Sequence, residues 1–585
     1  MRANERRITT SVLVIGTGGA GLRAAIELAE VGTDVLVIGK RPRLDAHTSL
    51  AAGGINAALG TMDPADSWQQ HAADTIKESY FLADPRTVEV VAKGAERGIA
   101  DLVRFGMDFA REDDGRISQR FFGAHTYRRT AFAGDYTGLA IQRALVDRAE
   151  QLRVPILDSL YVTRILTADG VVFGAYAFDL TEGTRYVLHA DAVILAAGGH
   201  TRIWRRTSSR RDENNGDSFR LAVDAGARLR DAELVQFHPS GLLAPENAAG
   251  TLVSEAARGE GGVLRNALGE RFMERYDPAR MELSTRDRVA LASYSEIKAG
   301  RGTPHGGVWL DVSHLPRETI VTRLPRVYQT LMDLQMLDIT TDPIEVAPTA
   351  HYSMGGVWVR PDDHGTDVEG LYAIGEAASG LHGANRLGGN SLIELLVYGR
   401  ITGRAAAEHS AGLEVHRRSR EAEEEAREEV RALLAADGRE NVRALQRAVR
   451  DTMTEHAGVL RDGEGLRAGL LDLEEIEGRA ESVGIHPDIA GFQDLAHAFD
   501  LKASLLAARA TLESALERRE TRGCHNRSDH PELDPALQVN LVWSPTTGVV
   551  REGVPPVPAE LTRLVREDVP IDGPDDEPGD QRPER

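Results

Sequence analysis

Cysteine is almost absent from this chain, which contains Cys524 and no other. A single cysteine cannot form an internal disulfide, which is typical of proteins from a reducing compartment. It also cannot ligate an iron–sulfur cluster, which requires about four cysteines. If the protein takes part in one-electron transfer, we therefore expect the iron–sulfur relay to lie on another polypeptide.

Long apolar runs and an excess of positive charge are missing as well. No apolar run approaches the roughly 18–20 residues that span a bilayer, and we expect no signal peptide at the N-terminus. The 69 Lys and Arg face 90 Asp and Glu, a net charge of −21. This balance argues against nucleic acid as a partner. It is still compatible with an anionic substrate, because local arginines and histidines can set the field in a cleft.

The chain of 585 residues is long enough for two to four domains, and its start has a βαβ pattern. We expect a buried strand at 11–15, a Gly-x-Gly-x-x-Gly turn at 16–21, a helix at 22–31 and a second strand at 34–38. A glycine turn in this context is typical of a dinucleotide-binding unit, although a purely structural turn is the alternative. The second strand ends in Gly39-Lys40 and lacks the acidic residue that binds the ribose of NAD. A freely exchanging nicotinamide cofactor is therefore disfavoured.

The most informative run is His-Gly-Ala-Asn-Arg-Leu-Gly-Gly-Asn-Ser-Leu at 382–392. It places Arg386 just before a Gly-Gly-Asn-Ser turn and an apolar helical stretch at 392–397. A guanidinium there can bind a carboxylate through two parallel hydrogen bonds. The free N–H groups at the helix start can face an anion, such as the N1–C2=O edge of a reduced flavin. The alternative interpretation of the run, taken alone, is a glycine-rich turn with a solvated arginine, which is the less favoured of the two.

Five further segments occur in a fixed order along the chain. They are Ala46-His47-Thr48 with Ala51-Ala52-Gly53-Gly54, Gln236-Phe237-His238-Pro239-Ser240-Gly241, the run at 254–262 (SEAARGEGG), Thr285-Arg286-Asp287, and the run at 350–356 (AHYSMGG). Together with 382–392 they resemble the flavoprotein subunit of succinate dehydrogenase and fumarate reductase over about residues 10–405. A weaker resemblance to the family's C-terminal Glu-Ser-Arg-Gly-Ala-His occurs at 519–525.

The resemblance implies an α/β fold in which a Rossmann-like FAD-binding domain carries an inserted α+β capping domain. Strands near 11, 191 and 371 would belong to the FAD-binding domain. The expected parts are the FAD-binding domain at 1–238 and 346–412, the capping domain at 239–345, a helical domain at 413–520, and a C-terminal segment at 521–585. We expect this last segment to be irregular after residue 519 and to end in a disordered acidic tail.

The implied cofactor is FAD, covalently joined through His47. The family's linking motif is Ser-His-Thr, and Ala46 stands here in place of the serine, while His47 and Thr48 remain. Glu376 would face the ribityl hydroxyls. The expected cofactor-binding residues are Gly16, Gly18, Gly19, Gly21, Lys40, His47, Thr48, Gly53, Gly54, Asp217, Glu376, Ser391 and Leu392, and no metal ion is expected.

The implied substrate is a four-carbon dicarboxylate, which needs a cationic or hydrogen-bonding clamp at each end. The resemblance places His351 and Arg386 on one carboxylate, and His238 and Ser254 on the other. Phe122 matches a phenylalanine of the family's active site. Considered one at a time, each histidine is more readily interpreted as a packed or surface residue than as a ligand.

Arg286 resembles the family's proton donor and acceptor, and Glu255 and Arg258 resemble the relay that serves it. Arginine normally stays charged, with a pKa above about 12. The role therefore requires neighbouring cations and desolvation to disfavour the charged form. Without Arg286, the Glu255–Arg258 pair would be interpreted as an exposed ion pair.

The expected function is interconversion of succinate and fumarate by hydride transfer to or from FAD, as in the tricarboxylic acid cycle. Electrons would pass to an iron–sulfur protein subunit, and from there through membrane anchor subunits to a quinone. The protein would be cytoplasmic and peripheral on the inner face of the cell membrane. The working direction, the quinone and the anchor composition stay open.

Alternative functions are L-aspartate oxidase, a soluble fumarate reductase-like flavoenzyme and a non-catalytic flavin-binding subunit. L-Aspartate oxidase usually lacks the linking histidine and differs at the position of Leu387-Gly388-Gly389. A non-catalytic subunit would be expected to lose Arg286 or the clamp. Both features are present, so the interpretation as a dehydrogenase or reductase is favoured.

Overall fold

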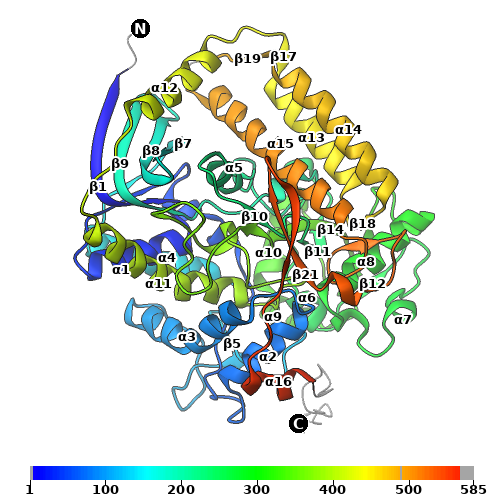
Figure 1. Ribbon diagram of the computed structural model, residues 1–585. Coiled ribbons are helices and arrows are strands. Elements are labelled where there is room, and N and C mark those ends of the chain that lie inside the picture. The colour runs from blue at the N-terminus through cyan, green and yellow to red at the C-terminus, as the bar shows by residue number, and fades with distance from the viewer. Residues whose placement is uncertain (1–3, 488–490, 567–585) are drawn as a thin grey trace.

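The computed structural model describes residues 4–487 and 491–566 (Figure 1). Its centre is a seven-stranded sheet, ordered β6 (Ile156–Leu157), β2 (Val35–Ile38), β1 (Glu5–Ile15), β9 (Arg185–Leu195), β8 (Val171–Asp179) and β7 (Leu160–Ala168), with β16 (Leu371–Ala373) paired to β9. β1 is parallel to β2 and β9, and β16 is parallel to β9. The carboxyl ends of these strands therefore meet at one edge. The predicted α/β fold is confirmed.

Both faces of this sheet are buried, which explains why its strands are almost continuously apolar. Along β1, Val12 and Val14 belong to one apolar cluster, and Leu13 and Ile15 belong to another on the opposite face. The first cluster includes residues of the helices α1 (Gly19–Glu30), α2 (Trp68–Glu78), α3 (Pro85–Arg104), α4 (Thr137–Gln151) and α11 (Asn390–Gly412).

The other face is covered partly by helices from the second half of the chain. α12 (Arg420–Leu434) packs on β7 and β8, and α13 (Val442–His456), α14 (Gly463–Ala480) and α15 (Gln493–Glu517) pack against one another. These three helices lie together in yellow and orange in Figure 1. α5 (Asp217–Asp224) lies between α15 and β7. The helices share one apolar cluster with the sheet, so their core is continuous with it.

A second sheet is antiparallel and has the strand order β11 (Val235–Leu242), β14 (Ile344–Ser353), β13 (Val308–Asp311) and β12 (Val263–Arg265). Its helices are α6 (Ala256–Gly259), α7 (Met273–Tyr276), α8 (Arg286–Glu296), α9 (Arg317–Arg323) and α10 (Pro325–Gln335). They enclose a separate apolar cluster between Leu242 and Val346. The predicted limits of the capping domain, 239 and 345, fall inside β11 and β14, so two continuous strands connect this unit to the rest.

The C-terminal segment is more regular than we expected, and the prediction of irregular structure after residue 519 is wrong for much of it. β21 (Val539–Ser544) and β22 (Gly548–Gly553) form a hairpin, and β21 pairs with β10 (Leu229–Arg230), which pairs with β15 (Gly356–Val357). α16 (Ala559–Arg566) packs on α2. The predicted acidic tail lies from 567 onward, outside the described residues.

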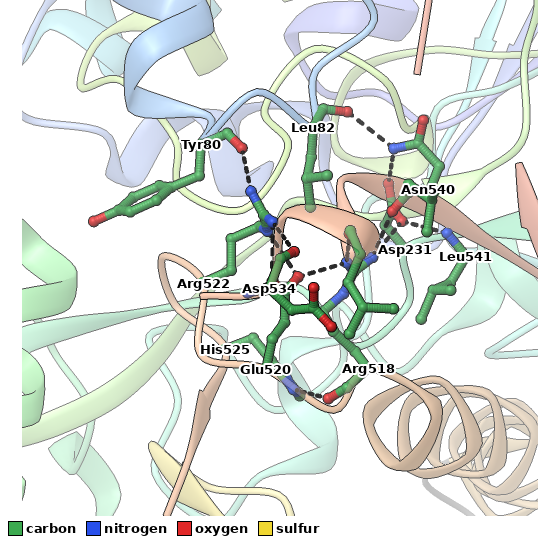
Figure 2. Close-up of polar contacts among 12 residues, drawn as sticks. Tyr80, Leu82, Asp231, Arg518, Glu520, Arg522, His525, Asp534, Asn540 and Leu541 are labelled. Atoms are coloured by element: carbon green, nitrogen blue, oxygen red, sulfur yellow. Dashed lines mark hydrogen bonds and ion pairs between the residues drawn. The ribbon is translucent and has the colours of Figure 1, made fainter. Parts of the chain in front are cut away.

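A buried ionic network fixes the start of this segment (Figure 2). Arg518, with a side-chain exposure of 0%, donates to Glu233 at 2.7 Å and to Glu520 at 3.2 Å. Arg522 donates to Glu520 at 2.7 Å and to the carbonyl oxygen of Tyr80 at 3.0 Å. The C-terminal loop is thereby held against the turn that follows α2.

The remaining short strands form small sheets that are separate from those described above. They are β3 (Ile55–Asn56), β4 (Gln119–Arg120) and β5 (Thr130–Ala131) in one sheet, β17 (Glu440–Asn441) with β19 (Val483–Gly484), and β18 (Leu460–Arg461) with β20 (Asn526–Arg527). Among the described residues, no helix has the length and apolar character needed to cross a bilayer.

Candidate active site

A cavity of about 1230 Å³ runs from the glycine-rich turn after β1 to the start of α8. Most residues predicted for the site line it. They are Gly16, Gly18, Gly19, Lys40, His47, Thr48, Gly53, Gly54, Phe122, Asp217, His238, Ser254, Glu255, Arg286, His351, Glu376, Arg386, Ser391 and Leu392. Two predicted residues do not line the wall: Gly21 packs beneath the turn, and Arg258 is buried behind Glu255.

Backbone packs closely against backbone at the glycine turn, so its positions require glycine. Gly16 has φ +124°, and a Cβ at this position would lie 2.2 Å from the carbonyl oxygen of Ala196. A Cβ at Gly21 would lie 2.0 Å from the carbonyl oxygen of Gly16. α1 begins at Gly19 without a side-chain cap. The Gly19 N–H is bonded to Thr48, and the N–H groups that follow it in the first turn suit an anion such as a pyrophosphate.

Lys40 and Asp217 lie together at the end of the cavity near β2. The Lys40 Nζ atom is 2.7 Å from Asp217 Oδ2 and 3.3 Å from Asp500 Oδ1. Tyr161 also donates to both carboxylates. Burial lowers the pKa of Lys40, but attraction to the two carboxylates outweighs it and raises the pKa above its ordinary value. The ammonium group is therefore already neutralised by protein.

His47 lies beside the glycine turn with one ring nitrogen occupied. Its Nδ1 atom is 2.8 Å from Glu213 Oε1, and Thr48 Oγ1 accepts a hydrogen bond from the Gly19 N–H at 3.0 Å. Burial lowers the pKa of His47, and attraction to Glu213 outweighs it and raises the pKa. Because Nδ1 is bound to Glu213, Nε2 is the nitrogen left for a covalent bond.

The flavin end of the expected cofactor site has an acidic residue and a free helix start. Glu376 Oε1 accepts from the Ser353 N–H at 3.0 Å, and burial raises the pKa of this carboxyl. α11 begins after Gly389, which has φ +87°, without a side-chain cap. A Cβ at Gly389 would lie 2.3 Å from Asn56 Oδ1, so this turn requires glycine. These features fit a flavin whose N1–C2=O edge faces the helix.

Arg286 and Glu255 form the core of the substrate end. Arg286 Nε donates to Glu255 Oε2 at 2.8 Å, and the same oxygen lies 3.8 Å from Arg258 Nη2. Burial would raise the pKa of Glu255, but the two arginines outweigh it and lower the pKa to about 2. An ionised Glu255 therefore connects the two guanidinium groups that the sequence analysis grouped with it.

Arg386 points into the same end and is held by neutral groups. It donates to Gln236 Oε1 at 2.9 Å and to Ser391 Oγ at 3.0 Å, and its guanidinium lies 4.5 Å from the centre of the Tyr352 ring. Gln236 Oε1 also accepts from Arg286 Nη1 at 3.4 Å. Burial, followed by repulsion from Arg286, lowers the pKa of Arg386 to about 10. Gln236 Oε1 thus accepts hydrogen bonds from both Arg286 and Arg386, and as a neutral group it balances neither charge.

His238 and His351 both line the cavity, and their rings pack edge to face with centres 5.5 Å apart. His238 Nδ1 accepts from the Ser240 N–H at 3.2 Å, so a neutral His238 carries its proton on Nε2 and can donate it. His351 Nδ1 lies 2.9 Å from Ser208 Oγ. Burial and nearby arginines hold the pKa of both imidazoles well below the ordinary value. Both rings are therefore neutral hydrogen-bonding groups.

Ser254 and Phe122 complete the predicted set. Ser254 Oγ accepts from the Ala256 N–H at 3.3 Å at the start of α6. The Phe122 ring packs beside Gly53 and Gly388, where an added Cβ would lie 2.8 Å and 3.2 Å from it. The aromatic ring therefore forms an apolar wall between the cofactor end and the substrate end.

This end of the cavity carries excess positive charge. Glu255 is shared by Arg286 and Arg258, while Arg386 bonds to neutral side chains, and its buried Nε atom has no hydrogen-bond partner among the described residues. A buried guanidinium left in this state costs free energy unless an anion binds to it. The geometry therefore suits a small dianion held between Arg386 and the two histidines.

Some residues of the site were missed by the sequence analysis. Gln236 lies inside a motif that was quoted for its histidine, so its position could have suggested a role. Glu213 and Ser208 line the cavity, and Asp500 contacts Lys40. All three come from distant segments and have no local pattern that would identify them.

Comparisons with known proteins agree with this geometry. A profile described as "FAD binding domain" matches residues 11–392, and one described as "Fumarate reductase flavoprotein C-term" matches 446–558. The chain is 40% identical to a subunit of the fumarate reductase (CoM/CoB) of Methanothermobacter marburgensis, covering 91% of this chain and 96% of that protein. It is 38% identical to the succinate dehydrogenase flavoprotein subunit of Rickettsia bellii, covering 92% and 95%.

Solved structures are similar over nearly the whole chain. Mycobacterium smegmatis Sdh1 in complex with UQ1 superposes with a TM-score of 0.87 at 37% identity, covering 95% of this chain and 96% of that one. E. coli quinol fumarate reductase superposes with a TM-score of 0.89 at 31% identity, covering 95% and 99%. The chain is thus an FAD-dependent oxidoreductase that belongs to the family of succinate dehydrogenase and fumarate reductase flavoprotein subunits.

Proposed function

We propose that this chain interconverts succinate and fumarate and passes the electrons to a separate iron–sulfur protein. The observation that carries the proposal is the pair of arginines, Arg286 and Arg386, joined through Gln236 at one end of the FAD cavity. Two cations and two neutral histidines that line one space match the charge and the hydrogen-bonding needs of a dicarboxylate.

In this proposal each carboxylate has its own set of donors. Arg386 and His351 bind one carboxylate, and His238 and Ser254 bind the other. Arg386 supplies a charge-assisted bond, and His238 supplies the N–H on Nε2. Phe122 excludes water beside the reacting carbons.

Arg286 transfers the proton in this proposal. Bound FAD supplies the acceptor and donor of hydride. Arg286 donates a proton to one substrate carbon or removes it, and Glu255 and Arg258 return the proton along their shared contacts.

We further infer that FAD is bonded covalently to His47 through Nε2. The Glu213 contact on Nδ1 orients the ring and leaves Nε2 toward the cavity. The pyrophosphate would lie at the glycine turn of Gly16–Gly21, the ribityl chain beside Glu376, and the isoalloxazine edge at Ser391 and Leu392. Lys40 and Asp217 would contact the adenosine end.

The electron partners follow from composition. One cysteine cannot build a cluster relay, so electrons leave through an iron–sulfur protein and, with anchor subunits, reach a membrane quinone. The chain would then be peripheral on the inner face of the cell membrane. The name of the Methanothermobacter relative carries CoM/CoB in place of a quinone, so the electron donor or acceptor has to be determined by experiment.

The test is turnover by the holoprotein purified with its partners. Succinate oxidation with a dye and fumarate reduction with a reduced artificial donor are both expected, and L-aspartate is expected not to be oxidised. The isolated chain is expected to reduce no quinone. Oxidation of L-aspartate without succinate turnover would contradict the proposal, and quinone reduction by the isolated chain would contradict the partner inference.

A further inference from the structure

A polar cluster lies directly behind the two arginines of the site, and its centre is Asn385. Asn385 Nδ2 donates to Glu78 Oε1 at 2.6 Å and to Asp287 Oδ1 at 3.0 Å. Its Oδ1 accepts from Gln236 Nε2 at 2.9 Å and from Cys524 Sγ at 3.3 Å. Asn385 precedes Arg386 in the chain, and Asp287 follows Arg286. The Arg286 charge acts on Glu78, so a change of charge at Glu78 acts on Arg286 in return.

The cluster contains two buried carboxyl groups that share one amide nitrogen. Glu78 and Asp287 are 8% and 7% exposed, and each accepts one hydrogen of the Asn385 amide. Two carboxylates this close in a buried place repel each other and are poorly solvated. One of them therefore keeps a proton under conditions in which both would ionise in water.

The positions of the two carboxyl groups at helix ends indicate which of them keeps the proton. Asp287 lies in the first turn of α8, where the free N–H groups stabilise a negative charge, and it accepts a second bond from the Tyr80 hydroxyl at 3.0 Å. Glu78 is the last residue of α2, where the carbonyl groups at the helix end disfavour a negative charge. The neutral carboxyl group is therefore Glu78.

The turn after α2 holds Tyr80 in the orientation that this arrangement needs. Tyr80 and Phe81 have φ of +52° and +62°, a conformation that is unfavourable for side chains of this size. Arg522 compensates by donating to the Tyr80 carbonyl oxygen at 3.0 Å (Figure 2). The C-terminal loop thus supports a strained turn from which the Tyr80 hydroxyl donates to Asp287.

We propose that Glu78 is a positioning residue that holds the proton of this pair and thereby limits the negative charge behind Arg286. The proposal rests on the proposed role of Arg286 in proton transfer. When Glu78 ionises, it releases one proton to solvent and leaves one additional negative charge in the cluster. That charge stabilises the charged form of Arg286, which then gives up its proton less readily, and turnover falls.

The electrostatics of the surroundings agree with this proposal. Burial, and then repulsion from Asp287, raise the pKa of Glu78 to about 8. The charged or titratable groups that act on Glu78 or lie in the cluster are Asp287, Arg286, Arg280, Arg288, Tyr80 and Cys524. Glu78 is therefore expected to ionise on the alkaline side of neutrality, and the lost proton should appear as an alkaline limb of the pH–rate profile.

The test compares pH–rate profiles of holoenzyme variants between about pH 6 and pH 10. Fumarate reduction is measured with an artificial donor, and each rate is divided by the variant's own maximum. In the wild type the relative rate is expected to fall by about tenfold per pH unit once Glu78 is ionised. Glu78→Gln cannot ionise, so its alkaline limb should move up by at least about one pH unit. Glu78→Asp keeps a titrating carboxyl group and should keep a limb.

Glu96→Gln, which removes an exposed carboxylate of α3, is the matched control and should show the wild-type profile. An alkaline limb in Glu78→Gln that coincides with the wild type would overturn the proposal. Infrared difference spectra give a second test that does not depend on folding of the Glu78 variants. A protonated carboxyl band present at pH 7 should disappear at about pH 9.5 both in the wild type and in Asp500→Asn, which lacks the other buried carboxyl group that titrates near neutrality. Absence of the band from Asp500→Asn at pH 7 would also overturn the proposal.

This outcome can be separated from failure of the proposed function. If Arg286→Gln retains turnover, Arg286 is not the proton donor and the foundation of the inference is lost. If Arg286→Gln is inactive while Glu78→Gln keeps the wild-type limb, the proposed function stands and the role of Glu78 is wrong.

Discussion

The buried cations at the two ends of the cavity differ in their partners. At the end near β2, Lys40 is bound by two carboxylates, Asp217 and Asp500. At the other end, Arg386 is bound by the neutral groups of Gln236 and Ser391. Both cations are largely buried, so the difference does not come from solvent.

The difference in partners separates cations that are balanced within the protein from a cation that is available to bind an anionic ligand. A cation whose charge is balanced by protein carboxylates stabilises the connection between segments, here β2, α5 and α15. A buried cation with neutral partners is a poor stabiliser and a good anion site. The same reasoning distinguishes Arg518, which is enclosed by Glu233 and Glu520, from Arg386.

The largest effect is expected at Arg286. Arg286→Gln should lower turnover in both directions by roughly 10²- to 10⁴-fold, because a proton-transfer group acts in the transition state. Bound FAD and the affinity for malonate should change little. Steady-state rates and malonate titrations of the flavin absorbance measure both quantities. Arg317→Gln, an exposed change in α9, is the control, and substantial turnover by Arg286→Gln would refute the assignment.

Arg386→Ala should weaken binding of succinate, fumarate and malonate together. Loss of a charge-assisted contact in a buried site corresponds to about 2–4 kcal/mol, or roughly 30- to 1000-fold in the dissociation constant. Malonate titration measures it, with the exposed Arg360→Ala as control. Malonate binding that is unaffected by the change would rule out a clamp role and remove the contrast between the two ends.

His47→Ser should separate the two directions of the reaction. The glycine turn, Glu376 and the start of α11 should still hold FAD without a covalent bond. The proposed covalent bond would raise the potential of the flavin, which succinate oxidation requires more than fumarate reduction does. The variant should therefore lose succinate oxidation and keep much of its fumarate reduction. Intact-mass spectrometry of the wild type provides the check, and a chain without the added mass of FAD would contradict the covalent link.

The smallest effect is expected at the charge-balanced end. Asp500→Asn leaves Lys40 paired with Asp217, so catalysis should stay within about twofold. Burial and repulsion from Asp217 raise the pKa of Asp500 from 3.8 to about 7. Between these pH values the folded protein holds a proton that the unfolded chain has released, so this group's contribution to stability falls as pH rises.

Thermal unfolding of the wild type and of Asp500→Asn at several pH values measures this contribution. The variant should lose that part of the pH dependence. Lys40→Met is the informative companion, because it leaves two buried carboxylates unbalanced and should strongly reduce the yield of FAD-loaded protein. Equal behaviour of the two variants would show that the balance of charge at this end is unimportant.

The local sequence pattern predicted the parts of the fold whose contacts are between residues close together in the chain. The strand, glycine turn and helix between residues 5 and 30 follow from apolar runs and from positions that only glycine can occupy. The hairpin at 539–553 was missed although its two strands are neighbours in the chain. What local pattern could not show is its pairing with β10, which lies about 300 residues earlier and contributes only Leu229–Arg230. Short strands with remote partners carry almost no periodic signal.

For the site, the sequence by itself determined the residue types that bear the chemistry, because each lies in a motif with its own local geometry. Only the tertiary structure decided how these groups are charged. Arg386 meets Gln236, His47 meets Glu213, and Glu78 meets Asp287 through contacts between distant segments. Burial and the distances to neighbouring charges set protonation, and neither quantity exists until the chain is folded.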